Sequence, residues 1–121
     1  MTDLIETLVL FKDKANTHPR IASLIKGWEP TIVVEATDSG TKRYLPVRAC
    51  RIASVDTGDD TEDGAPAGHV VHLRAAEAVL AAVFDGRSNP ADAFLEGDLE
   101  IFASDKDQVK LDAISLVLWG A

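Results

Sequence analysis

The hydrophobic residues nearest the N-terminus recur at the spacing of an α-helix, at Leu4, Leu8, Phe11 and Ala15. Positions three or four apart share one helical face, so this pattern predicts an amphipathic first helix. Asp3 and Glu6 have the spacing of a capping box at its start. Pro19 suits the first position of a second, short helix, and Gly27 suits its C-terminal end.

The next segment changes to the pattern of a β-hairpin. Thr31 to Thr37 contains the β-branched run Ile32-Val33-Val34, and Asp38-Ser39-Gly40 supplies turn residues. A second extended segment runs from Lys42 to about Val55. Because Pro46 has no N–H to donate to a neighbouring strand, we expect this second arm to be an edge strand or to contain a bulge.

The second half of the chain begins with a loop and continues with mixed elements. Asp56 to Gly68 is rich in acidic residues, glycine, proline and threonine, which is loop composition. The elements expected after it are a strand at His69 to Leu73, a helix at Ala75 to Phe84, a short helix from Asn89-Pro90, a strand through Leu99 and Ile101, a polar turn at Ser104 to Asp107 and a last helix from about Val109 to Trp119.

The length and composition describe one ordinary globular domain covering residues 1–121. The chain has 121 residues, of which 46% are hydrophobic and 26% charged. Its formal net charge of −8 argues against nucleic acid as a partner, because phosphate neutralisation needs a basic surface. The sequence has neither a basic amphipathic helix nor a long apolar run, so it gives no indication of stable membrane insertion. A single cysteine, Cys50, and the lack of a signal peptide pattern favour the cytoplasm.

Motifs for covalent chemistry or metal binding are missing from the sequence. His69 and His72 are three apart in an expected strand, so their rings should point to opposite faces rather than share a metal. The acidic loop from Asp59 does not fit the calcium-loop consensus. No phosphate-binding glycine loop or nucleophile elbow occurs. We therefore expect no catalytic residue, no cofactor and no metal, and an activity other than that of an enzyme.

One constellation in the second half is more specific. It consists of Gly86, Asn89, Pro90, Ala93, Phe94, Gly97, Leu99 and Ile101 at fixed spacing. Each has a structural reason: Gly86 suits a positive φ, Asn89-Pro90 starts a helix, and Gly97 releases the chain into a strand. The segment from about Val70 to Ile101 resembles the sterol carrier protein domain family. Lys26-Gly27 before the run of β-branched residues is similar to that family's junction between helix and first strand.

The resemblance implies an α+β fold, with a twisted, mostly antiparallel sheet of about five strands and helices covering one face. It also implies an apolar tunnel between sheet and helices, and no catalytic residue. Carried onto this sequence, the ligand-binding residues are Leu80, Val83, Phe84, Phe94, Leu99 and Ile101. The chain departs from the family pattern at Arg74-Ala75, which offers no side-chain helix cap, and at Phe102-Ala103-Ser104, where a glycine often follows the strand.

Three functions remain open on the sequence alone. The favoured hypothesis is an intracellular carrier for an apolar small molecule or lipid, such as a sterol, a fatty acyl chain or an isoprenoid. The second is a partner-binding or regulatory module of the same fold with a filled cavity. The third is a small α+β isomerase or hydrolase, which needs a buried acid-base pair, whereas Glu96 and Glu100 look solvent-facing. The apolar segment Leu116 to Trp119 is expected either to cover the tunnel or to contact a second copy or a protein partner.

Overall fold

The computed structural model describes residues 4–57 and 69–119. The helices are α1 (Leu4–Thr17), α2 (Pro19–Leu24), α3 (Glu77–Phe84), α4 (Pro90–Leu95) and α5 (Asp105–Trp119). The strands are β1 (Thr31–Ala36), β2 (Thr41–Arg48), β3 (Arg51–Ile52), β4 (Asp56–Thr57), β5 (Val70–Ala75) and β6 (Leu99–Phe102).

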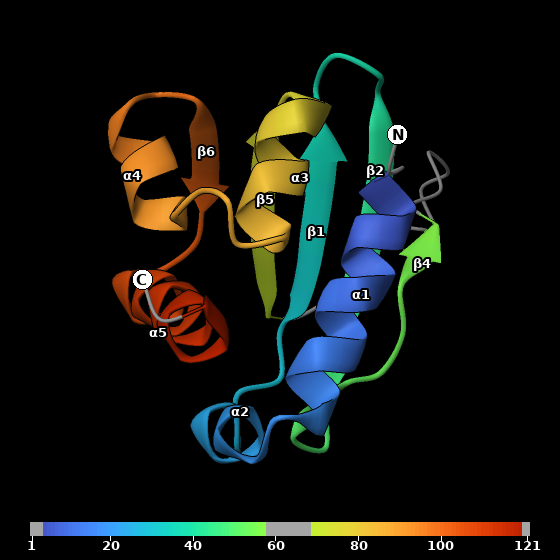
Figure 1. The fold of residues 1–121 in the computed structure, drawn as a ribbon, viewed down its shortest axis with the longest axis vertical. Helices are drawn as coiled ribbons and strands as arrows, with labels where there is room; N and C mark the ends of the chain where they lie inside the picture. Colours follow the sequence, from blue (N-terminus) through green and yellow to red (C-terminus); the bar gives the residue numbers. More distant parts are fainter. Residues whose placement is uncertain (1–3, 58–68, 120–121) are drawn as a thin grey trace.

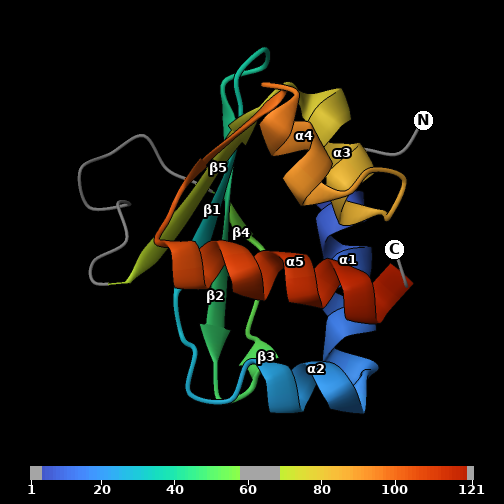
Figure 2. The same cartoon turned by 90° about the vertical axis from the view of Figure 1, so that its left-hand side faces the viewer.

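The strands form one mixed sheet in the order β3-β2-β1-β5-β6, with β4 also pairing with β2. Only β1 and β5 run parallel, and the other pairs are antiparallel. Figures 1 and 2 show that the helices gather over one face of this sheet. The predicted α+β architecture, a mostly antiparallel sheet with helices on one face, is therefore confirmed.

Alternation along the strands decides which face the helices cover. In β1, Ile32, Val34 and Ala36 are at most 2% exposed, and β5 contributes Val71 and Leu73 beside them. Side chains two apart in a strand share a face, so these residues form a continuous apolar floor. The helices pack against this face and complete the core with side chains that are almost fully buried, among them Leu4, Leu8, Phe11, Leu80, Phe84, Leu111 and Ile114.

The second arm of the hairpin differs from the prediction. The arm expected from Lys42 to Val55 is broken at Arg48, and β3 and β4 then pair with separate parts of β2. The loop expected from Asp56 starts later, because β4 begins there, and residues 58–68 lie outside the described residues. Pro46 lies between the two pairing segments, where its missing N–H leaves β2 without a donor for a continuous neighbour.

Helix α3 receives its cap from a different part of the chain. The sequence offers no capping side chain at Arg74-Ala75, and Ala76 at the N-cap makes no side-chain hydrogen bond. The Asp38 carboxylate, in the turn between β1 and β2, accepts a hydrogen bond of 3.0 Å from the Glu77 backbone N–H. The hairpin turn thus satisfies a helix donor that would otherwise be unpaired. The cap predicted at Asn89 is confirmed, with its side chain accepting from Ala91 N–H at 2.8 Å.

A buried carboxylate joins three segments at one end of the sheet. Asp107, in the first turn of α5, is 5% exposed. It accepts a hydrogen bond of 2.7 Å from Trp28 Nε1 and lies 2.9 Å from His69 Nε2. Burial by itself raises the pKa of Asp107, but the hydrogen bonds from Trp28, His69 and Ser104 and the electrostatic effect of His69 together lower it by more, so the pKa lies below the ordinary 3.8. The ionised carboxylate therefore ties α5 to the starts of β1 and β5.

The lowered pKa of Asp107 predicts a pH-dependent contribution to stability. The ionised form stabilises the fold above the ordinary pKa of 3.8, and this contribution is lost as the pH falls through the lower folded-state value. Asp107→Asn should reduce the free energy of unfolding by about 1–3 kcal/mol at pH 6. The difference from the unsubstituted protein should shrink below pH 4. Urea unfolding at several pH values measures this difference in the free energy of unfolding, and Asp105→Asn, at an exposed position, is the control. A difference that does not change with pH would contradict the lowered pKa of Asp107.

The turn between β2 and β3 predicts a stabilising substitution. Ala49 and Cys50 have φ values of 54° and 63°, and they form the two-residue connection between the paired Arg48 and Arg51. Such turns favour Asn-Gly, because other residues are strained at positive φ. Ala49→Asn combined with Cys50→Gly should raise the free energy of unfolding by about 1 kcal/mol. Ala53→Gly, outside this turn, should lower it, and a melting temperature that falls in the double variant would refute this reading of the turn.

Candidate functional site

Two small apolar voids lie between the sheet and the helices. The first has a volume of about 30 Å³ and is bordered by Val83, Pro90, Ser115 and Trp119 among others. The second has about 20 Å³ and is bordered by side chains that include Ile21, Trp28, Ile32 and Val47. Each void has room for about one water molecule.

The two voids are separated by a shared set of side chains. Phe11, Phe84, Leu111 and Ile114 border both of them. The rings of Phe11 and Phe84 meet edge to face, with centroids 4.9 Å apart and an interplanar angle of 79°. We call these two rings the aromatic partition. The partition, together with Leu111 and Ile114, lies between the two voids.

The predicted ligand-binding residues occupy different positions relative to the voids. Val83 and Phe84 border the first void. Leu80 and Leu99 are at most 1% exposed and belong to the core. Ile101 is half-buried against that core, and Phe94 is 40% exposed on α4. The structure thus brings two of the six to a void, and the role of all six in binding stays a prediction.

Other residues at the voids escaped the sequence analysis. Phe11, Leu111 and Ile114 belong to apolar helical patterns that mark an inner face, but those patterns do not say which inner residue borders a void. Trp119 ends the predicted last helix, but its contacts with Phe11 and with the turn after α3 come from distant parts of the chain and cannot be read from periodicity. A Cβ built on Gly86 would lie 2.5 Å from the Trp119 ring, and Gly86 has the predicted positive φ, +88°. Glycine is needed at this position because the turn requires a positive φ and because a Cβ would clash with the Trp119 ring.

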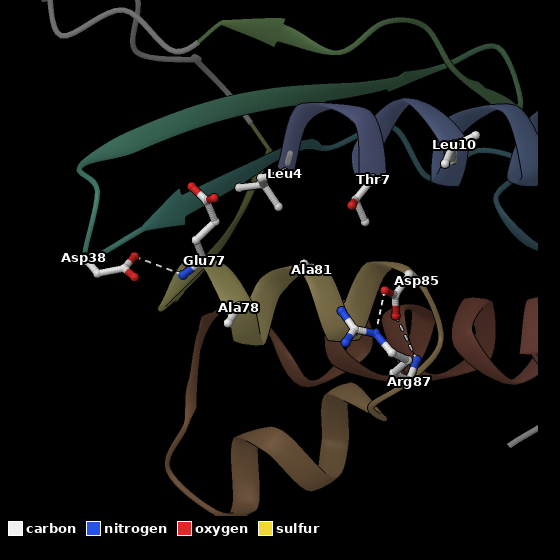
Figure 3. A pocket seen from close by; sticks show the side chains of 9 residues that line it. All are labelled: Leu4, Thr7, Leu10, Asp38, Glu77, Ala78, Ala81, Asp85 and Arg87. Carbon is white, nitrogen blue, oxygen red and sulfur yellow. Dashed lines mark hydrogen bonds and ion pairs between the residues drawn. The ribbon is translucent and has the colours of Figure 1, made fainter. Parts of the chain in front are cut away.

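A groove between α1 and α3 hollows the surface, as Figure 3 shows. It has a volume of about 670 Å³. Its floor contains Ala78 and Ala81, and its ends carry charged groups. Glu77 accepts a hydrogen bond from Ser39 at 3.3 Å, and Asp85 pairs with Arg87 at 2.7 Å. These charged groups therefore already have partners within the chain.

The histidines point to opposite faces of the sheet, as predicted. His69 contacts Asp107 on the helical side, whereas His72 Nε2 lies 2.9 Å from Glu35 on the outer face. Within residues 4–57 and 69–119, no group of three or more His, Cys, Asp or Glu side chains is placed to hold a metal ion. No helix in that part of the chain is long and apolar enough to cross a membrane.

Asp107 is the buried carboxylate that the sequence analysis missed. The sequence placed it only at the end of an expected polar turn, Ser104 to Asp107, whereas in the structure Trp28 and His69 bond to it. Glu96 and Glu100 are exposed, as expected. The Asp107 oxygens are engaged by Trp28 and His69, so the carboxylate links α5 to the segments that precede β1 and β5.

Comparisons with known proteins identify the fold. No protein-family model and no curated protein matches the sequence. A crystal structure of sterol carrier protein 2 is 15% identical with a TM-score of 0.64, covering 97% of this chain and 95% of that one. Sterol carrier protein 2 from Yarrowia lipolytica is 14% identical with a TM-score of 0.60, covering 96% and 91%.

A third similar structure is part of a much larger enzyme. The sec-alkylsulfatase Pisa1 from Pseudomonas sp. is 16% identical with a TM-score of 0.56, and the match covers 89% of this chain but only 14% of the sulfatase. The fold therefore occurs both as nearly a whole chain and as one segment of a longer protein. The chain has the sterol carrier protein fold over almost its entire length.

Proposed function

We propose that this domain binds one apolar ligand of the lipid type without covalent chemistry and acts as its carrier. The observation that carries the proposal is the pair of apolar voids on either side of the aromatic partition, between the sheet and the helices. The likeness to structures named sterol carrier protein supports the same reading. The ligand would lie along the path of the two voids, against Val83, Phe84 and the inner face of α5.

The volumes require the site to open when a ligand binds. Ligand sites have volumes of about 300–1,000 Å³, at least tenfold more than either void. A lipid ligand would therefore require a more open arrangement of the helices than the one described here. The lining suits an apolar ligand, because Ser115 is the only polar residue that borders the first void among the described residues.

The small size of the voids also favours a second candidate, the partner-binding module with a filled core. In that case the apolar residues on the outside of α5 would serve the interaction. Val109 is 66% exposed and Leu116 is 56% exposed, seven positions apart on one helical face. Leu118 is buried and Trp119 packs against Phe11, so only part of the Leu116 to Trp119 segment is free for a partner.

Substitution at Ile114 separates the two candidates. Ile114 borders both voids, so Ile114→Trp should fill the path of the two voids and lower the affinity for a fluorescent fatty-acid probe by about tenfold or more. Overpacking should cost about 1–3 kcal/mol of stability. Leu116→Trp is the matched control, because it adds the same side chain to the exposed face of α5. Probe titration and thermal unfolding measure both variants.

Two results would contradict the carrier proposal. One is a protein that is free of extractable lipid by native mass spectrometry and never binds the probe. The other is equal loss of probe binding in Ile114→Trp and Leu116→Trp while both variants remain folded by circular dichroism. The first result, combined with capture of a second copy or a partner through Leu116, would favour the filled-core module.

A further inference from the structure

The two ends of α5 are held by different kinds of contact. At its start, Asp107 is bonded to Trp28 and His69, and the Lys110 ammonium donates a hydrogen bond of 2.6 Å to the Leu24 carbonyl. These polar contacts are directional and fix the position of the first turns. In Figure 2, α5 runs from the sheet toward the outer side of the helical layer, so its end lies farthest from the sheet.

The last turn of α5 is packed against apolar surface. The Trp119 ring stacks on Phe11, with centroids 6.0 Å apart and an interplanar angle of 27°, and it lies so close to Gly86 that a Cβ there would be 2.5 Å from the ring. Trp119 also borders the first void. Apolar contacts of this kind lack directional preference, so the ring can leave them without breaking a fixed hydrogen-bond geometry.

The other elements around the first void are fastened at positions that oppose opening. The end of α1 is tied to β3, because the Asn16 side chain donates to the Ile52 carbonyl at 2.9 Å and accepts from its N–H at 2.8 Å. The start of α3 is tied to the hairpin turn through Asp38. Among α1, α3 and α5, the last turn of α5 is therefore the wall best suited to move.

We infer that Trp119 is the gate of the ligand site. The last turns of α5 swing about the first turn, which Asp107 and Lys110 hold, and Trp119 leaves Gly86 and Phe11. This movement opens the first void at its border with the α3–α4 turn, and a single apolar chain then reaches the aromatic partition. The inference rests on the proposed function and adds to it the route of access and the residue that controls it.

The test compares rates of probe binding in variants that displace Trp119 by two independent routes. Trp119→Ala removes the ring, and Gly86→Ala places a Cβ at 2.5 Å from it and forces it aside. Stopped-flow measurements with a fluorescent fatty-acid probe should show association and dissociation about tenfold faster in both variants. Trp119→Leu provides a bulkier apolar replacement should Trp119→Ala fail to fold.

Matched controls separate gating from general destabilisation. Gly97 also has a positive φ, +83°, but a Cβ there meets no atom within 4 Å, so Gly97→Ala imposes similar backbone strain without touching Trp119. Leu116→Ala changes the exposed face of the same helical end. Both controls should keep the rates of the unsubstituted protein within about twofold. Acrylamide quenching of tryptophan fluorescence should increase in Gly86→Ala and remain unchanged in Gly97→Ala.

The possible outcomes separate failure of the gate from failure of the carrier proposal. Faster exchange in the Trp119 and Gly86 variants alone supports the gate. Normal probe binding with unchanged rates in those variants overturns the gate and leaves the carrier proposal intact. Equal acceleration in Gly97→Ala also overturns it, because backbone strain alone would then explain the rates. No probe binding in any folded form of the protein overturns the carrier proposal and the gate together.

Discussion

The buried Asp107 carboxylate is the interaction on which the arrangement of this domain depends. Its hydrogen bonds reach Trp28 before β1 and His69 before β5, which are the two parallel strands at the centre of the sheet. The same residue lies in the first turn of α5, which closes the helical layer. A buried charge is costly unless it is paired, so the three segments must meet correctly for the fold to form.

Beyond Asp107 and the contact from Lys110 to Leu24, α5 packs on the core mainly through apolar side chains. With one end of the helix fixed, Leu111, Ile114 and Leu118 need only pack against neighbours, and packing of that kind leaves small voids beside Phe11 and Phe84. Close-packed interiors resist insertion, whereas an interface that is fixed at one end and apolar at the other can open. The proposed carrier function and the proposed gate follow from this difference between the two ends.

The sequence predicted the fold class well because its strongest signals are local. Helical spacing, the β-branched run, Asn89-Pro90 and the glycines at Gly86 and Gly97 each act within a few residues. It failed where the determining partner is distant in the chain: Asp38 caps α3, and Asp107 is buried by Trp28 and His69. The candidate site was only partly predictable for the same reason, because Phe11 and Trp119 reach the first void from opposite ends of the chain.

The central claim is that an apolar chain lies between the sheet and α5, across the aromatic partition. Nuclear magnetic resonance of the isotope-labelled protein with an unlabelled C16 fatty acid tests this most directly. We expect nuclear Overhauser contacts from the ligand methylene groups to the rings of both Phe11 and Phe84. Contacts confined to the groove residues Leu4, Leu10 and Ala81, or to the outer face of the sheet, would contradict it.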